Sequence, residues 1–515
     1  MLLDANSDVE VQAELTADIV IVGAGTVGLY LASALAEARP DANIIIIEAG
    51  PRVASTALNS TTAISVGRSH AGVSLGRAAG LGGTSTLWGG QLAEFEPWDM
   101  ERADAPWPIS YPELARHYAT VYQRLGIGSP AGDAVYRQKL GGETAQVESI
   151  QRFFTHWLPQ PNFAAVYRAM ILARNAVRVV VNLTANGCMF DGDVARMLRC
   201  VSASGRRVSI YGRRVVFAAG TIATNRFFLS TQRAGQVPWA DNGQVGCYFQ
   251  DHLGGRIATA SVHDERKFRD YFENGWVGGK KLQPKLTLSH AARQSLPSGA
   301  CGMFSFDSSI AENIGDLKKT IRGIRSGLSF SSATSGVHDL IAVGGSALPI
   351  AVRYLRDRRI FALFDRGVAF NVQAEQVPIA RSTIRLQDGG TAADGLVPVV
   401  VHWHCDGCEI DSIHRLAVEA DAYLRRHGLA QLEINQGLLN RDPAFLDRLG
   451  DTNHPCGGMR MSATANTGVV DPNCRVWESA NVWVTGATVF PSSSHANCTL
   501  TALALATRLV PKLAQ

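Results

Sequence analysis

The 515-residue chain has little excess charge, because 49 basic residues against 45 acidic ones leave a net charge of only +4. The charges are scattered rather than gathered in runs, which argues against nucleic acid or an anionic membrane as a partner. No apolar stretch reaches the roughly eighteen residues that a membrane-spanning helix needs. The nearest, Leu340 to Val352, is interrupted by Gly344, Gly345 and Pro349. We expect that stretch to pack in a core or against another copy of the chain.

The nine cysteines are an odd number and follow no regular spacing between Cys188 and Cys498, so the sequence contains no disulfide framework. The N-terminus is acidic where a secretory signal has a basic patch and an apolar core. We therefore expect reduced thiols and a cytoplasmic protein. With 46% hydrophobic and 18% charged residues, the chain has the composition of a globular protein and the length for two or more domains.

Glycine, by contrast, is abundant, and its first cluster follows a continuous apolar run at 19–22. Such a run is typical of a strand buried on both faces of a parallel sheet. The cluster is a complete G-x-G-x-x-G that opens an apolar helix pattern. In this motif Gly23 makes a tight turn, Gly25 lets the backbone approach a pyrophosphate, and Gly28 lets the helix pack closely on the strand.

A second apolar strand, at 44–47, ends in Glu48, twenty residues after Gly28. A carboxylate at that place accepts hydrogen bonds from a ribose. Strand, glycine turn, helix, second strand and acidic residue together predict a dinucleotide-binding fold. These residues by themselves leave FAD and NAD both open.

A second glycine cluster, Gly80 to Gly90, contains five glycines in eleven residues. Glycine at this density disfavours helix and strand, so we expect a loop, laid along a flat cofactor with Trp88 as an aromatic wall. Further along, an apolar strand at 208–219 runs into Gly220 and a helix pattern. This is a second strand of the nucleotide-binding type, so the dinucleotide domain is expected to be discontinuous.

A different pattern occupies residues 260–445, where apolar alternation and short apolar runs alternate with turns. Strands are predicted at 368–372, 383–386 and 399–403, and a helix at 410–424. We expect a second domain built on a mostly antiparallel sheet. Earlier in the chain, Ser110 and Glu113 form an S-x-x-E capping box, which predicts the start of another helix.

The segment from His402 to Cys408 gathers two histidines and two cysteines, in the order His402, His404, Cys405 and Cys408. Four ligands within seven residues are cramped, whereas structural zinc sites usually draw pairs of ligands from two separated segments. No second pair follows nearby. We interpret the segment as a strand running into a helix, expect no metal, and assign no role to Cys405 or Cys408.

The C-terminal segment carries a family resemblance. It reads H-P-C-G-G-M-R-M from His454, V-T-G-A-T-V-F-P up to Pro491, and H-A-N-C-T-L-T up to Thr501. In order, and nearly in spacing, these motifs resemble the tail of the glucose–methanol–choline (GMC) family of FAD-dependent oxidoreductases. The strand ending at Gly220 and the segment G-C-Y-F-Q-D-H ending at His252 resemble family motifs as well. All these segments cover a little over a quarter of the chain.

The resemblance implies FAD rather than NAD and the oxidation of an alcohol to a carbonyl. His454 matches the family's active-site base, and Asn497, forty-three residues later, matches the residue paired with it. A neutral imidazole can take the hydroxyl proton near pH 7 as a hydride leaves the carbon for the flavin. His495 is a rival base, which we rank as lining the substrate site. Cys498 stands where the family usually has proline, and Ser462 where it usually has glycine.

The glycine motifs and the resemblance together predict the residues that contact FAD. They are Gly23, Gly25, Gly28, Glu48, Gly82, Gly83, Thr84, Trp88, Ala219, Gly220, Asp251, Gly486, Ala487 and Thr499. The helix beginning at Thr499 would present its positive end to the pyrimidine part of the flavin. No metal ligand is predicted.

Within the family, the loop at 82–88 is most similar to the pyranose oxidase branch, in which a histidine of S-T-H-W is bonded to FAD. Leu87 occupies that position here, so we expect non-covalent FAD. The likeness favours a sugar or glycoside as substrate, with oxygen or another electron acceptor as the second partner. A sterol, an aliphatic alcohol or an aminoglycoside is the alternative, as is a flavin-binding protein without redox chemistry. A homo-oligomer is compatible with the sequence.

The expected fold class is α/β, with a discontinuous Rossmann-like FAD-binding domain and an α+β substrate-binding domain. The expected boundaries are 1–258 for the first part of the FAD-binding domain, with inserted cap segments at about 120–175, then 259–449 for the substrate-binding domain and 450–515 for the C-terminal part with the catalytic pair.

Overall fold

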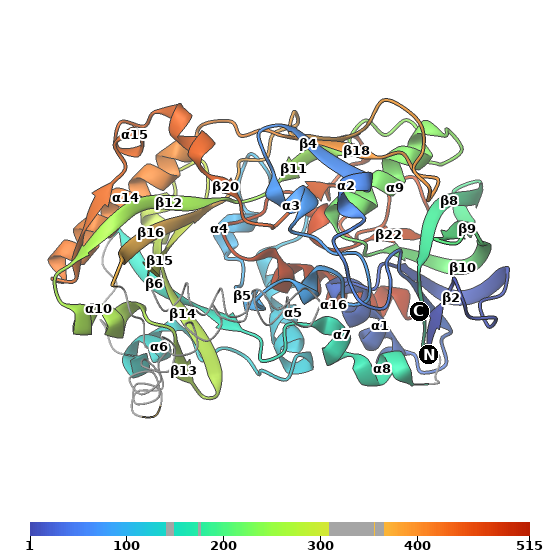
Figure 1. The fold of residues 1–515 in the computed structure, drawn as a ribbon, viewed down its shortest axis with the longest axis horizontal. Helices are drawn as coiled ribbons and strands as arrows, with labels where there is room; N and C mark the ends of the chain where they lie inside the picture. Colours follow the sequence, from blue (N-terminus) through green and yellow to red (C-terminus); the bar gives the residue numbers. More distant parts are fainter. Residues whose placement is uncertain (141–148, 174–176, 308–354, 356–364) are drawn as a thin grey trace, which may run out of the picture.

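The computed structural model describes residues 1–140, 149–173, 177–307, 355 and 365–515. The molecule is elongated, with a parallel sheet and both termini at one end and an antiparallel sheet at the other (Figure 1). In the described part of the chain, no helix combines the length and the hydrophobicity needed to cross a bilayer. The apolar run from Leu340 to Val352 lies outside the described residues.

The parallel sheet contains the predicted dinucleotide-binding strands. In spatial order it consists of β1 (Leu2–Asp4), β7 (Val177–Val181), β3 (Ile44–Ile47), β2 (Glu14–Val22), β10 (Arg207–Phe217), β9 (Val194–Ser202) and β8 (Leu183–Asp191), with β22 (Val482–Val484) also paired to β10. All neighbours from β1 to β10 run parallel, as does β22, whereas β9 and β8 are antiparallel. The β2 run Ile19–Ile21 and all of β3 are buried, as a strand covered on both faces requires.

Three helices form a layer, in which α16 (Cys498–Leu513) packs against both α1 (Thr26–Ala38) and α5 (Tyr111–Arg124), and α1 packs on β2 and β3 of the parallel sheet. Helix α16 is buried along most of its length between the other two (Figure 1). The predicted capping box of α5 forms only in one half, because Ser110 Oγ accepts from Glu113 N at 3.4 Å whereas the Glu113 carboxylate accepts from Arg508 Nε at 2.7 Å. A charged partner on α16 therefore takes the carboxylate away from the helix end.

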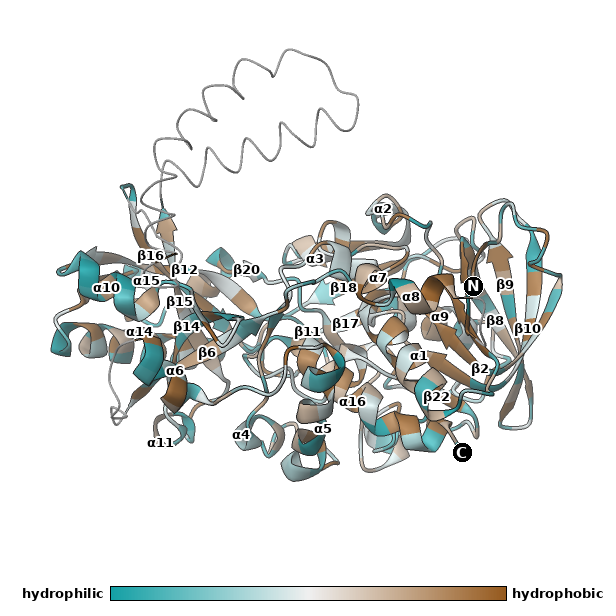
Figure 2. Ribbon diagram, turned by 90° about the horizontal axis from the view of Figure 1, so that it is seen from below, coloured by the Kyte–Doolittle hydropathy of each residue, from teal (hydrophilic) through white to brown (hydrophobic). Residues whose placement is uncertain are grey.

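The antiparallel sheet lies at the other end of the molecule (Figure 2). In spatial order it consists of β19 (Ala430–Ile434), β12 (Leu253–Val262), β16 (Gly367–Ala374), β15 (Ala300–Asp307), β14 (Lys280–Leu288), β6 (Ile150–Trp157) and β5 (Gln91–Leu92), with β13 (Gly275–Val277) on β14 and β20 (Gly450–Asp451) on β12. Strands β5 and β6 precede residue 258, the predicted end of the first part of the FAD-binding domain. Segments from before that boundary therefore also contribute strands to the antiparallel sheet.

A third sheet joins the two ends of the molecule. It consists of β21 (Cys456–Gly458), β11 (Cys247–Gln250), β17 (Thr383–Leu386), β18 (Val399–Trp403) and β4 (Ala63–Gly67). As predicted, β18 runs into a helix, α14 (Glu409–Arg426). The remaining described α-helices are α2 (Asn59–Thr62), α3 (Ala71–Ser74), α4 (Pro97–Met100), α6 (Asp133–Leu140), α7 (Phe163–Val166), α8 (Arg168–Leu172), α9 (Thr221–Arg233), α10 (Glu265–Phe272), α11 (His290–Arg293) and α15 (Gln436–Leu439). The predicted α/β fold class is confirmed, whereas the exact domain boundaries stay predictions.

The antiparallel sheet has one apolar and one polar face. Leu286, Phe304 and Phe370 lie on the face that α14 covers, in one buried cluster with that helix. Because successive side chains of a strand alternate between faces, Lys285 of β14 and Gln373 of β16 lie on the opposite face. That polar face is directed toward the residues that follow Pro491, which are described next.

Candidate active site

The predicted glycines lie at the carboxyl edge of the parallel sheet. Gly23 has φ +108°, and a Cβ there would lie 2.7 Å from the carbonyl oxygen of Ala218. At Gly28 a Cβ would lie 1.9 Å from the carbonyl oxygen of Gly23, so helix α1 can approach the turn only without a side chain. Gly25 differs, because the nearest atom to a Cβ there is the Cα of Gly83 at 3.9 Å. The protein leaves free space beside Gly25.

The second glycine cluster packs directly on the first. Gly82 N donates to the carbonyl oxygen of Ala24 at 2.9 Å, and both Gly82 and Gly83 have positive φ angles, +89° and +53°. The segment is a loop as predicted except for one 3₁₀ turn, Gly83–Thr86. Trp88 Nε1 donates to the carbonyl oxygen of Pro161 at 2.8 Å, which fixes its ring on the segment before α7.

Glu48 connects the two glycine loops. One carboxylate oxygen accepts from Ala24 N at 2.8 Å, and the other accepts from Gly50 N at 3.0 Å and Gly80 N at 2.8 Å. Burial raises the pKa of Glu48, and these hydrogen bonds oppose that shift. The Oε2 atom, with one backbone donor, retains acceptor capacity for a ribose hydroxyl.

The other predicted cofactor residues near this edge follow β10 and β22, whose last residues Phe217 and Val484 are register partners. A Cβ on Gly220 would meet no atom within 4 Å, and one on Gly486 would meet only a Val27 methyl at 3.9 Å. Both glycines are among the residues predicted to contact the cofactor here, which are Ala219, Gly220, Gly486 and Ala487. The N-terminus of α1 has no side-chain cap and no acidic residue in its first turn, which leaves it suited to an anion. The residues present fit the pyrophosphate of a dinucleotide.

The predicted catalytic pair is brought together across forty-three residues of sequence. Asn497 Nδ2 lies 3.2 Å from His454 Nε2. The backbone N–H of His454 donates to both oxygens of Asp251, at 3.0 Å each. Burial, together with the charges of His252 and Lys285, lowers the pKa of His454 to about 3 against the opposing effect of Asp251. His454 is therefore neutral at pH 7, the form in which imidazole acts as a base.

The hydrogen bonds around His454 select its tautomer. Nδ1 lies 2.8 Å from Thr452 Oγ1 and 3.0 Å from His252 Nδ1. The Thr452 hydroxyl donates to Asp251 at 3.5 Å, and His252 Nε2 donates to the carbonyl oxygen of Ser493 at 3.4 Å. In its neutral form His252 then accepts at Nδ1, so Nδ1 of His454 carries the proton and Nε2 holds the lone pair.

Asp251, predicted among the cofactor residues, accepts from the backbone N–H of His454 and forms an ion pair with His70. His70 Nε2 is 3.1 Å from Asp251, and Nδ1 is 3.8 Å from Asp451. The pKa of His70 is raised, since both carboxylates together outweigh the opposing effect of burial, which is the largest single contribution. The pKa of Asp251 is lowered by His70 and the other histidines against its own burial. The sequence indicated nothing at His70, which stands in a segment without a motif.

These three side chains are the one group within the described ranges whose atoms could share a metal ion. Their oxygens are already taken by N–H donors, among them Ala71 N at 2.6 Å and Gly72 N at 2.9 Å on Asp451. A protonated His70 supplies the positive charge that a metal would supply. We therefore assign this cluster to positioning of the His454 segment.

The raised pKa of His70 predicts how stability depends on pH. Below about pH 6.5, the ordinary pKa of histidine, His70 is charged in both states and its ion pairs stabilise the native state in full. As the pH rises through the raised native pKa, this contribution is lost. Wild type and His70→Gln are compared by denaturant titration from pH 5.5 to 8.5. We expect the difference between their free energies of unfolding, wild type minus variant, to become smaller as the pH rises. A difference that grows with pH would contradict the assignment, and His263→Gln, at an exposed position, is the control.

Cys498, beside Asn497, contacts a second buried cysteine. Cys498 begins α16, and its Sγ lies 3.1 Å from Sγ of Cys456, which follows His454 by two residues. The Cys456 thiol and His252 lower the pKa of Cys498 to about 6 against its burial. All nine cysteines are unpaired thiols.

His495 lies on the polar face of the antiparallel sheet. Its ring stands edge-on to Phe153, with centroids 6.0 Å apart, and its carbonyl oxygen accepts from Gln373 Nε2 at 2.7 Å. Nδ1 of His495 is buried without a hydrogen-bond partner among the described residues. Burial, with Arg293 adding to the effect, holds its pKa well below the usual range.

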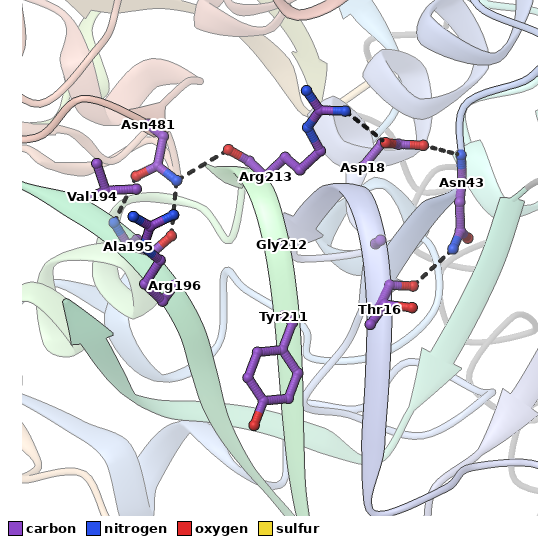
Figure 3. Close-up of a pocket in the computed structure, with 11 residues that line it drawn as sticks. Thr16, Asp18, Asn43, Val194, Ala195, Arg196, Tyr211, Gly212, Arg213 and Asn481 are labelled. Atoms are coloured by element: carbon purple, nitrogen blue, oxygen red, sulfur yellow. Dashed lines mark hydrogen bonds and ion pairs between the residues drawn. The ribbon is translucent and has the colours of Figure 1, made fainter. Parts of the chain in front are cut away.

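A separate depression of about 580 Å³ opens at the other edge of the parallel sheet (Figure 3). It lies beside Thr16 and Asp18, early in β2, whereas the glycine turn follows the end of that strand. The Asn481 side chain in its wall is fully occupied by the backbone of Ala195 and Arg213. Because open α/β sheets bind ligands beyond the carboxyl ends of their strands, we assign no ligand to it.

The comparisons with known proteins agree with this geometry. Residues 378–506 match the family model described as GMC oxidoreductase, and residues 18–62, which contain the first glycine motif and Glu48, match that described as lycopene cyclase protein. No curated protein sequence matches the chain.

Several solved structures are similar over nearly the whole chain. They include pyridoxine 4-oxidase from Mesorbium loti (TM-score 0.62, 16% identity, 96% of this chain and 99% of that one), a fungal aryl-alcohol oxidase (0.58, 15%, 97% and 99%) and a formate oxidase from Aspergillus oryzae (0.57, 16%, 98% and 98%). At such identities the likeness is one of fold and does not select a branch of a family.

Proposed function

We propose that this chain is a GMC-type FAD-dependent oxidoreductase acting on CH–OH or similar groups, and that it oxidises an alcohol on a sugar or glycoside with His454 as the base. The observation that carries the proposal is the meeting of His454 Nε2 with the Asn497 amide at 3.2 Å. The imidazole is neutral, and its lone pair lies beside a second polar group that can hold the substrate hydroxyl.

The protein's own residues handle the proton. His454 takes it from the hydroxyl at Nε2, and Asn497, which is uncharged, orients the oxygen without competing for it. The imidazolium that results keeps its Nδ1 proton in contact with Thr452 and His252, and its positive charge faces the ion-paired carboxylate of Asp251. FAD, when bound, supplies the two-electron acceptor for the hydride that leaves the carbon.

The polar face of the antiparallel sheet supports a hydroxyl-rich substrate. Gln91 Nε2 donates to Thr155 Oγ1 at 2.6 Å and also to the side-chain oxygen of Gln283. Such amide and hydroxyl groups suit a sugar better than a sterol. We also propose that FAD is held without a covalent bond, because Leu87, 51% exposed, offers no nucleophile at the loop position of the pyranose oxidase likeness.

Anaerobic bleaching of the flavin tests the proposal. The purified yellow protein is mixed with monosaccharides, glycosides, aminoglycosides, sterols and simple alcohols, and the flavin absorbance is followed. We expect a sugar or glycoside to bleach it, and admission of air then separates an oxidase from a dehydrogenase. Bleaching only by another alcohol would keep the chemistry and reject the sugar. If no alcohol bleaches a flavin that dithionite does reduce, the protein binds flavin without oxidising alcohols.

A further inference from the structure

Lys285 is a buried cation that the reaction described above does not use. It lies in the middle of β14, is 2% exposed, and forms no hydrogen bond or ion pair with any residue that the structure describes. Burial lowers its pKa. An ammonium group taken out of water without a partner costs several kcal/mol, so its presence calls for a partner that arrives from outside the chain.

Strand register places Lys285 on the face that meets His495. Its partner across the ladder is Phe153 of β6, and directly paired residues of an antiparallel ladder point to the same side. The ring of Phe153 contacts the ring of His495 edge-on. Lys285 therefore shares with Phe153 the side of the sheet on which the His495 segment lies.

Strand β16, which lies beyond β15 on the other side of β14, also contacts the His495 segment. Thr287, two residues after Lys285, is the register partner of Cys301 on β15, and Cys301 is the partner of Gln373 on β16. Gln373 donates to the carbonyl oxygen of His495. Phe153, in the row of Lys285, and Gln373, in the next same-face row with Thr287, thus both contact the His495 segment.

Electrostatics connects Lys285 with the base as well. Its positive charge lowers the pKa of both His454 and His495, so the ammonium acts on the space that the two histidines border. On the side away from His495, the adjacent same-face residue is Gln283, which belongs to the amide network with Gln91 and Thr155. A cation with hydroxyl-binding groups on one side and the His495 segment on the other has the layout of a subsite for part of the substrate.

We propose that Lys285 binds an anionic group of the substrate, so that the alcohol oxidised at His454 also carries a carboxylate or a phosphate. This inference rests on the proposed function of the His454 site and narrows its substrate class to acidic alcohols such as sugar acids or sugar phosphates. The anion supplies the charge partner that the protein lacks, and a charge-assisted hydrogen bond in a buried site is strong. Lys285 is thereby a specificity-determining residue.

Binding of small anions that cannot be oxidised tests the subsite without any turnover. The FAD-loaded protein is titrated with acetate and, separately, with inorganic phosphate, and binding is read from flavin absorbance and tryptophan fluorescence. We expect Lys285→Met to weaken binding about tenfold or more, and Lys285→Arg to retain most of it. The better of the two anions identifies carboxylate or phosphate as the group. Equal binding to wild type and Lys285→Met, or no binding of either anion to wild type, would overturn the proposal.

A matched pair of substrates provides the second test. Glucuronate and glucose differ in a carboxylate, and a phosphorylated and a free sugar differ in a phosphate. We expect Lys285→Met to lower kcat/KM for the anionic member about tenfold or more and to leave the neutral member nearly unchanged. Equal losses for both members would assign Lys285 to the structure of the sheet and not to recognition.

Two controls complete the design. Lys281→Met removes a cation from the same strand face, where Lys281 lies 4.3 Å above the Trp157 ring, and should leave anion binding unchanged. Lys285→Met should melt no lower than wild type, because it replaces an unpaired buried charge by an apolar group of similar length. If acetate or phosphate binds through Lys285 while no alcohol bleaches the flavin, the reaction assigned to His454 fails and the anion site stands.

Discussion

Replacing His454 with alanine is expected to slow reduction of the flavin by about 10²–10⁴-fold while FAD stays bound. The imidazole lone pair at Nε2 faces the Asn497 amide. Among the described residues, no second side-chain nitrogen contacts Asn497, so no neighbouring base can take over the proton transfer. Rapid mixing of the anaerobic protein with a substrate measures the reduction rate, and the flavin spectrum after gel filtration measures retention of FAD.

His495→Ala separates the two candidate bases. His495 is buried against Phe153 and Gly299, where a Cβ on the glycine would lie 2.8 Å from its Nδ1. We expect its replacement to change substrate affinity more than the reduction rate at saturation. Normal reduction by His454→Ala together with loss of reduction in His495→Ala would reverse the assignment. His263→Ala, at an exposed position, should behave as wild type.

Two alanine substitutions in the first glycine motif should separate stability from cofactor binding. Gly28→Ala places a Cβ 1.9 Å from the carbonyl oxygen of Gly23, so helix and turn must separate. We expect the free energy of unfolding of the apoprotein to fall by about 2–3 kcal/mol. Gly25→Ala meets nothing closer than 3.9 Å and has an ordinary φ of −83°, so the apoprotein should keep its stability within about 0.5 kcal/mol.

The same Gly25→Ala variant should weaken binding of FAD about tenfold or more, because its methyl group occupies the space left for the pyrophosphate. Denaturant titration of the apoprotein and fluorescence titration with FAD measure the two quantities separately. If Gly25→Ala bound FAD as tightly as wild type, the free space beside Gly25 would have another purpose. Gly243→Ala is a suitable control, since a Cβ there would meet no atom within 4 Å and Gly243 lies in the turn before β11, away from the glycine loops.

Local sequence patterns predicted several elements of this fold, above all those of the dinucleotide-binding unit. The strands Ile44–Ile47 and Val399–Trp403 have the bounds predicted from the sequence. All four residues of Ile44–Ile47 are buried, so no polar position within that run blurs its ends. The positions of the glycine loops were also predicted from local sequence, because the requirement for a positive φ or a missing Cβ lies at the glycine residue itself.

The pairing of His454 with Asn497 was predicted only because the tail resembles a known family. Forty-three residues separate the two, and no periodicity of the chain connects them. The structure places them together because β21, after His454, pairs with β11 of the third sheet while α16, after Asn497, packs between α1 and α5. A family resemblance can therefore predict a contact between two distant residues that local sequence patterns do not indicate.

Only the tertiary structure decided which polar groups act as partners. Glu113 was predicted to close its own helix end and instead pairs with Arg508, since a charged partner stabilises a carboxylate more than a backbone amide does. His70 has no motif, yet it lies between Asp251 and Asp451. Lys285 looks in the sequence like any exposed strand lysine. Strand register alone turns it toward His495, because a side chain's face depends on which residue lies opposite it in the sheet.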